Sequence, residues 1–229
     1  MPHSNYISPS GEIYPSATEL TSLLPQKWLW SWYKQAIWKH GKRGWQKCKA
    51  QSNRGLRIGT ETHALLESFI TKKPPEYISG KYDSQAIADA LYDKVNPLVD
   101  EYTSIEPHLI SEKYRIHGTA DMIVRLNYDT GLWVGDWKTA AGRDMAHPIQ
   151  LAIYAMCWNE MCDEVLIDKG FIARVDKKSK KLTVHIDEYK GLKQYYPVVL
   201  ALREIYEYSN KLGVYGKPDV KMGAEVSEA

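Results

Sequence analysis

The sequence predicts an α/β protein with a mixed central sheet flanked by helices and an added helical layer at the N-terminus. Segments in which apolar residues recur every three or four positions predict helices, and shorter β-branched segments bounded by turn-forming residues predict strands. Along the chain these segments follow in the order helices, three strands, helix, two strands, helix. This succession is typical of an α/β core, because a sheet needs helices to cover its faces.

The predicted elements have the following bounds. Helices are expected at residues 16–24, 25–41, 60–71, 83–102, 148–161 and 187–212. Strands are expected at residues 105–114, 119–126, 132–137, 165–175 and 181–186. Pro97 is expected to kink or end the fourth helix.

Length and charge indicate one globular domain. The 229 residues include 30 Lys and Arg and 28 Asp and Glu, a formal net charge of +2. A chain of this size buries a substantial core. Because it is nearly neutral, any affinity for nucleic acid must come from a local patch. We expect one domain over residues 1–212, with a helical, basic and Trp-rich segment 1–57 before a core 58–212, and a loosely ordered tail 213–229.

Cysteine content and the N-terminus narrow the class of protein. Cys48, Cys157 and Cys162 form no CxxC pair, so neither a zinc site nor a disulfide framework is expected. An iron–sulfur cluster takes four cysteines and is not expected either. The first residues lack a basic start followed by an apolar run, and no mitochondrial leader is visible. We therefore expect a protein of the cytoplasm of a bacterium or a phage-infected cell, without a membrane partner.

The strongest local signal is a β-hairpin between His117 and Thr139. Its turn-forming residues span 127–131. A turn centred between residues 128 and 129 places Asp121 opposite Asp136, with Cβ atoms about 5 Å apart. Lys138 follows Asp136 by two positions and therefore shares its face of the strand. Two carboxylates and one ammonium are expected to meet there.

Such a pair of carboxylates suits a divalent cation. Unshielded, the two anions would raise each other's pKa, whereas a bound cation keeps both ionised. Carboxylate oxygens are the ligands of Mg²⁺ and Mn²⁺, whose remaining positions hold water and substrate phosphate. The alternative is a surface hairpin with solvated charges, in which Asp136 and Lys138 form an ordinary ion pair. The residues alone leave both interpretations open.

Four motifs in order resemble a known superfamily. Gly118-Thr-Ala-Asp121 followed by Asp136-Trp-Lys138-Thr resembles the signature of the PD-(D/E)XK nucleases, in the form found in the RecB-like exonuclease branch. Gly59-Thr-Glu-Thr-His63-Ala-Leu-Leu-Glu67 resembles the histidine helix of that branch, and Gln150-Leu-Ala-Ile-Tyr154 resembles its QxxxY helix. The resemblance implies a restriction-endonuclease-like core and metal-dependent hydrolysis of DNA, preferably at single-stranded ends.

Other functions stay open beside this one. Within the same chemistry, the chain would be a double-strand end-processing exonuclease of the phage recombination type, or an endonuclease. From another class, it would be a DNA-binding or assembly module that cleaves nothing.

The resemblance also implies a metal site. Asp121, Asp136 and His63 would hold one or two ions, and the imidazole ligand favours Mn²⁺ over Mg²⁺. Glu67 lies one turn after His63 and is a candidate partner for the other ring N–H. The structural alternatives are a packed core histidine and a surface glutamate.

The remaining implied roles concern substrate and water. Lys138 would orient the attacking water or stabilise charge on the phosphate oxygens. Gln150 and Tyr154 would steady the metal-bound water and the DNA backbone, although both would equally suit a buried polar cap on a packing helix. Glu112 lies where members of the family often carry an acidic residue, and its role is left open.

The N-terminal region is rich in tryptophan and basic residues. Five of the eight tryptophans lie between Trp28 and Trp45. Such a stripe is more often core, although one or two rings would stack on bases at a DNA path. Residues 39–57 hold seven Lys and Arg and no acid, which indicates a solvated face or a phosphate-guiding segment over the active site. We expect Arg54, Arg57 and the loop residue Arg143 to contact DNA phosphates.

Overall fold

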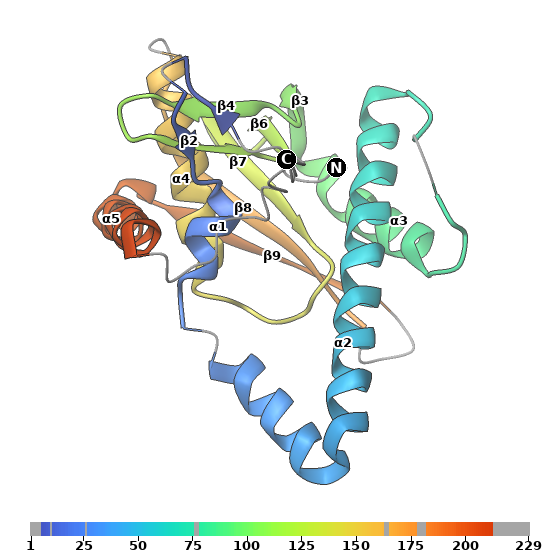
Figure 1. Ribbon diagram of the computed structural model, residues 1–229. Coiled ribbons are helices and arrows are strands. Elements are labelled where there is room, and N and C mark those ends of the chain that lie inside the picture. The colour runs from blue at the N-terminus through green and yellow to red at the C-terminus, as the bar shows by residue number, and fades with distance from the viewer. Residues whose placement is uncertain are drawn as a thin grey trace, which may run out of the picture.

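A mixed five-stranded sheet forms the centre of the molecule. The computed structural model describes residues 6–9, 11–25, 27–75, 78–162, 165–177 and 182–212. In sheet order the strands are β3 (Val99–Ile105), β6 (Met122–Leu126), β7 (Leu132–Lys138), β8 (Ile167–Asp176) and β9 (Thr183–Lys190). β7 and β8 run parallel and the other neighbours antiparallel. This confirms the predicted α/β class with a mixed central sheet flanked by helices (Figure 1).

Helices and two small ribbons surround this sheet. The helices are α1 (Ala17–Ser22), α2 (Lys27–Thr71), α3 (Ser84–Val95), α4 (Ala146–Met161) and α5 (Tyr196–Leu212), with the 3₁₀ turns η1 (Asn96–Leu98) and η2 (Leu192–Tyr195). The ribbons pair β1 (Tyr6–Ile7) with β2 (Ile13–Tyr14), and β4 (His108–Ser111) with β5 (Ile116–Thr119). None of the helices described is long and apolar enough to cross a membrane.

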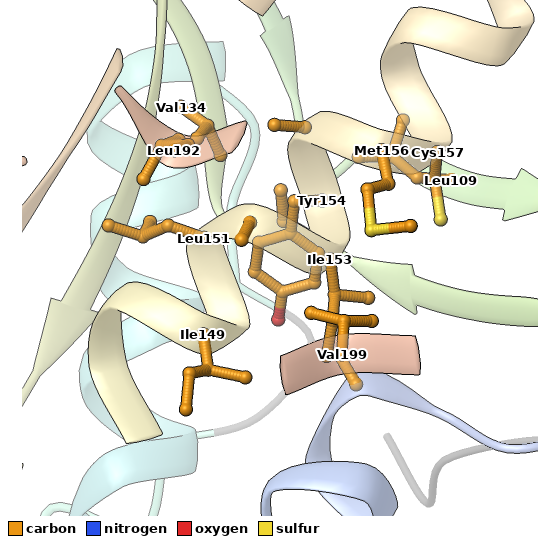
Figure 2. Packing of buried hydrophobic residues seen from close by; sticks show 14 of the residues in the cluster. Leu109, Val134, Ile149, Leu151, Ile153, Tyr154, Met156, Cys157, Leu192 and Val199 are labelled. Carbon is orange, nitrogen blue, oxygen red and sulfur yellow. The ribbon is translucent and has the colours of Figure 1, made fainter. Parts of the chain in front are cut away.

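Alternation along the strands gives the sheet two buried faces. One face presents Ile123, Val134 and Ile172 to a cluster that also contains side chains of α1, α4 and α5. Figure 2 shows the α4 part of this cluster, with Tyr154 among aliphatic side chains. The opposite face presents Val124, Trp133 and Phe171 to α2 and α3. Residues of β7 therefore point alternately toward α4 and toward α2.

A glycine bends α2 into a helical hairpin. Gly41 has φ 55° and ψ −140°, a left-handed conformation that glycine adopts without steric cost. The segment before it packs back on the segment after it, and a Cβ atom on Gly44 would lie only 2.0 Å from the carbonyl oxygen of Ala36. We call residues 27–59 the helical arm. Figure 1 shows the arm reaching away from the sheet at the lower end of α2.

Several predicted boundaries are wrong. The predicted helix 60–71 is the end of a helix that continues from the turn at Gly41, so the expected division at residues 57/58 lies inside α2. Residues 99–102 belong to β3 rather than to a helix, because pairing with β6 overrides their helical spacing.

Three further boundaries differ. The predicted strand 105–114 is divided between β3 and β4, and the predicted strand 119–126 is interrupted at residues 120–121. Residues 187–190 end β9, so the last helix begins only at Tyr196. The predicted tail 213–229 lies outside the described residues.

Candidate active site

The hairpin forms in the predicted register. Met122 pairs with Gly135 and Ile123 with Val134, and the pairing ends one position before Asp121 and Asp136. Asp121 directly precedes β6, and its Oδ2 accepts a hydrogen bond of 2.6 Å from the backbone N–H of Trp137. The two aspartates therefore lie beside each other where β7 ends.

A chain of polar contacts links β7 to α4. Asp136 and Lys138 point toward α4, and Lys138 Nζ lies 2.6 Å from Asp136 Oδ2. The same ammonium donates to Gln150 Oε1 at 3.1 Å. Gln150 Nε2 in turn donates to the Tyr154 hydroxyl at 2.7 Å. The structure thus brings the predicted lysine together with both residues of the predicted QxxxY helix.

Gly118 makes room for Tyr154. A Cβ atom at this position would lie 2.7 Å from Cε1 of the tyrosine ring. No side chain fits there unless the ring moves, and the ring is buried. Burial raises the pKa of Tyr154 well above its ordinary value, so its hydroxyl stays protonated. The glycine of the Gly118-Thr-Ala-Asp121 motif therefore has a packing role at the site.

His63 approaches the aspartates from α2. Its Nδ1 lies 3.0 Å from Asp121 Oδ1 and its Nε2 lies 3.1 Å from the Trp137 carbonyl oxygen. Because a carbonyl only accepts, Nε2 carries a proton and Nδ1 faces the carboxylate. The prediction that Glu67 holds this N–H is therefore wrong, since the Trp137 carbonyl does so. Glu67 instead lines a small cavity beside His63 and Asp121, together with Glu106.

Burial and charge pairing set the pKa values of the cluster. Burial raises the pKa of Asp136 to about 6, although the neighbouring Lys138 opposes this shift. Burial also acts to raise the pKa of Asp121, but the His63 charge and hydrogen bond outweigh it and lower that pKa. The same contact with Asp121 outweighs the effect of burial on His63 and raises its pKa. The charged groups of the cluster therefore pair with one another.

The side chains of Asp121, Asp136 and His63 are chemically suited to bind a divalent cation. Two carboxylates and one imidazole are ligand types of Mn²⁺ and Mg²⁺ sites, and a backbone carbonyl that holds the second ring nitrogen is typical of metal-binding histidines. In the part of the chain that the structure describes, no three His, Cys, Asp or Glu side chains form a group that could hold a metal. Lys138 lies against Asp136, and His63 against Asp121. A cation at this position would have to replace these two ion pairs.

The three arginines predicted to contact DNA lie outside the cluster. Arg143, in the loop between β7 and α4, donates to Asp187 from Nε at 2.8 Å, while 73% of its side chain is exposed. Arg54 precedes His63 by nine residues and so lies on the opposite face of α2. Its guanidinium carbon is 5.8 Å from the centroid of the Tyr82 ring. Arg57 is exposed on the arm.

Two acidic residues near the site were not predicted from the sequence. Glu106 has a left-handed φ of 47° in the turn after β3, and its N–H donates to the Asp121 carbonyl oxygen at 3.0 Å. Burial raises the pKa of Glu106, and the nearby charge of Glu67 raises it further. Asp187 of β9 accepts hydrogen bonds from both Arg143 and Arg174. No local motif marks either residue, because their partners lie far away along the chain.

Two further contacts complete the surroundings of the site. Arg174 donates to the Ala141 carbonyl, so Asp187 and Arg174 together fix the loop between Lys138 and Gln150. Glu112 accepts hydrogen bonds from the hydroxyls of Tyr6 and Tyr14. Its observed contacts therefore hold the N-terminal ribbon rather than the cluster.

Comparison with known proteins gave no family for the chain. No family model matches it, and no curated protein does. Among solved structures, the protein SSO0001 aligns with a TM-score of 0.40 at 16% identity, over 84% of this chain and 74% of its own. An alkaline exonuclease, LHK-Exo from Laribacter hongkongensis, aligns with a TM-score of 0.39 at 9% identity, over 88% and 93%. The same enzyme in complex with dAMP gives a TM-score of 0.38 at 9% identity, over 88% and 94%.

Proposed function

We propose that the protein hydrolyses phosphodiester bonds of DNA with Mg²⁺ or Mn²⁺, preferably at single-stranded ends. The observation that carries the proposal is the meeting of Asp121, Asp136 and Lys138 where β7 ends, with His63 facing them from α2. Two carboxylates, an imidazole and an ammonium within one small space are the groups that metal-assisted phosphodiester hydrolysis needs.

Three side chains would hold the ion. The carboxylates of Asp121 and Asp136 and Nδ1 of His63 are the groups on which it would lie, and the Trp137 carbonyl keeps the imidazole oriented. When bound, such an ion lowers the pKa of a water molecule and draws charge from the scissile phosphate. His63 must lose its second proton for this role, because only the neutral imidazole has a free lone pair.

Lys138 would act on the phosphate or on the water. With an ion held by Asp136, the Lys138 ammonium would be free to donate to a phosphate oxygen or to the attacking water, where developing charge is stabilised most. Gln150 holds this ammonium through its Oε1, and Tyr154 holds Gln150. These two residues position Lys138 and keep its donor aimed at one place.

The preference for single-stranded ends rests on likeness of motifs. The four motifs of this chain resemble those of the RecB-like branch, which includes the mitochondrial genome maintenance exonuclease, an enzyme that acts on single-stranded DNA. Arg143 is the proposed phosphate contact beside the site, because its exposed guanidinium lies in the loop that joins Lys138 to α4. For Arg54 and Arg57 we propose phosphate contacts along the arm rather than at the site.

Three substrates offered side by side test the proposal. An end-labelled single strand, the matching duplex and a closed single-stranded circle are incubated with Mn²⁺ or Mg²⁺, and the products are sized. We expect rapid shortening of the linear single strand, slower loss of the duplex and an intact circle. Cleavage of the circle would indicate an endonuclease, and faster loss of the duplex a double-strand end-processing enzyme. Failure to cleave any nucleic acid with either metal would contradict the proposal and favour a non-catalytic DNA-binding module.

A further inference from the structure

The helical arm presents two tryptophans to solvent. Trp38 is 86% exposed and Trp30 is 64% exposed, so the expectation that this stripe is core is wrong for these two rings. Lys34 lies midway between them and is also exposed. Residues four and eight positions apart lie within about 80° of the helix circumference. Trp30, Lys34 and Trp38 therefore share one side of the first helix of the arm, which we call the tryptophan face.

Other residues hold the arm together. The Tyr33 ring packs against the Trp45 ring with centroids 4.9 Å apart, and Cys48 is buried. Gly44 allows the two helices to approach at Ala36. The tryptophan face thus has no packing role in the hairpin. Two indoles left in water forgo a large hydrophobic gain, which is typical of surfaces that a partner covers.

The charge of the arm indicates a polyanionic partner. Residues 27–60 contain nine Lys and Arg and no Asp or Glu. Because the whole chain has 30 basic and 28 acidic residues, the remainder is net acidic and the arm is the basic region. Proteins that hold single strands combine cations for the backbone with aromatic rings on which bases stack. A duplex keeps its base faces inside the helix, so only a single strand offers them to these rings.

The arm leads directly to the candidate active site along α2. Lys42, Lys49 and Leu56 precede His63 at intervals of seven residues, a spacing that drifts by only about 20° per step. They are exposed and lie on the same side of the helix as the histidine. From Lys42 to His63 the helix rises about 32 Å. A strand bound at the arm would therefore run toward the site over several nucleotides.

We propose that the helical arm is a binding surface for single-stranded DNA, separate from the site of hydrolysis. Bases stack on Trp30 and Trp38, and Lys34, Lys42 and Lys49 hold the phosphates that follow. The identification of the bound strand as DNA rests on the proposed function. It adds a second contact region, which holds the substrate while its end lies at Asp121 and Asp136.

Binding without hydrolysis tests the tryptophan face. The affinity of the full chain for a labelled thymidine strand of about 30 nucleotides is measured in EDTA, for wild type and for the double variant Trp30→Ala/Trp38→Ala. Loss of a stacked base weakens binding by about 5- to 150-fold per ring, so we expect at least about a tenfold loss. Tyr208→Ala removes a ring that is 65% exposed on α5 and is the matched control, with no expected change. Trp38→Phe should keep part of the affinity, because it keeps an aromatic face.

Hydrolysis of long and short substrates separates this inference from the proposed function. A trinucleotide in the site is too short to reach Trp30 and Trp38, because α2 rises about 32 Å from Lys42 to His63 and stacked nucleotides rise only about 3.4 Å each. The double variant should cleave the trinucleotide as wild type does and the long strand more slowly. If wild type cleaves both and the double variant matches it in cleavage and binding, the inference fails and the function stands. If wild type binds the strand through these rings but cleaves nothing, the function fails and the inference stands.

Two outcomes would assign the tryptophan face to another partner. An equal loss of affinity for a duplex of the same length would show that base stacking is not involved. Ring-dependent binding to phosphatidylserine vesicles, with unchanged affinity for the strand, would show a membrane-surface contact. Either result would overturn the proposal.

Discussion

The cluster of the candidate active site and the helical arm lie at opposite ends of α2 and are built in opposite ways. In the cluster, the charged groups are buried or half-buried and pair with one another, and only 3% of the Asp136 side chain is exposed. On the arm, every ionised side chain is basic and Trp38 is almost fully exposed. A buried charge costs free energy unless it is paired, so each charged side chain of the cluster is held in place by an oppositely charged neighbour. On the arm, the basic side chains and the exposed tryptophan rings remain available to a binding partner.

This difference predicts different consequences of mutation. Changes in the cluster remove groups that no neighbour can replace, and they should affect hydrolysis far more than binding. Changes on the arm remove one contact among several, and they should affect binding more than hydrolysis.

Removal of either aspartate should have the largest effect. Asp121→Ala and Asp136→Ala each take away a carboxylate that the proposed ion needs, and we expect hydrolysis to fall below detection, by at least about 10²- to 10⁴-fold. Affinity for a single strand in EDTA should change little, because the arm is intact. Asp100→Ala removes an exposed carboxylate of β3 and is the control. Substantial hydrolysis by either aspartate variant would exclude that residue from the site.

Gly44→Ala should disrupt the helical arm but not the rest of the fold. The added Cβ would overlap the Ala36 carbonyl oxygen, and overpacking of this kind costs about 3 kcal/mol. Hydrogen exchange should show lost protection of residues 27–50 but not of the sheet, and hydrolysis of a trinucleotide should persist. Gly55→Ala, in the same helix, meets no atom within 4 Å and should be neutral or stabilising. Equal effects of both variants would contradict the close approach of the two helices.

Asp187→Asn should weaken the support of the loop between β7 and α4. Burial acts to raise the pKa of Asp187, but the hydrogen bonds from Arg174 and Arg143 lower it below its ordinary value of 3.8. A carboxyl with a lowered pKa contributes stability above that value and loses the contribution as the pH falls below it. We therefore expect the variant to be about 2 kcal/mol less stable at pH 7, with a smaller difference below pH 3.8. Urea unfolding at both pH values measures this, and a difference that grows in acid would contradict it.

Lys49→Ala and Arg54→Ala should differ in their effect on the binding of a single strand. Lys49 lies on the same side of α2 as His63, whereas Arg54 lies on the opposite face and contacts Tyr82. Loss of one phosphate contact lowers the slope of log affinity against log salt by about 0.7 for a single strand. We expect this change for Lys49→Ala and a smaller one for Arg54→Ala. The reverse order would place the DNA path on the other side of the arm.

Local rules predicted the parts of the molecule whose partners are close in sequence. The turn between β6 and β7 set the register of the two strands as equal counting from its centre predicts, and Asp121 follows beside the Trp137 N–H. The helix expected at residues 16–24 formed as α1, and a capping box between Ser16 and Glu19 holds its start. The spacing of four between Gln150 and Tyr154 likewise placed both side chains in contact.

Features set by distant partners could not be predicted. Glu106 and Asp187 acquire their roles from contacts with Asp121 and with two arginines that only the folded chain brings near. Residues 99–102 continue the helical spacing of the preceding segment, yet pairing with β6 makes them a strand. Trp30 and Trp38 recur at helical intervals in the same way as core residues do. Helical spacing alone therefore did not separate these exposed rings from core residues.

The rate of cleavage by Lys138→Ala is the most direct test of whether the cluster around Asp121, Asp136 and Lys138 is the active site. A linear single strand is digested with Mn²⁺ by wild type and by the variant, while melting temperature and affinity in EDTA are measured on both proteins. We expect cleavage by wild type and a rate lower by about 10²- to 10⁴-fold in the variant, with folding and affinity retained. Equal rates of cleavage would remove the lysine from the mechanism and contradict the assignment of this cluster as the active site.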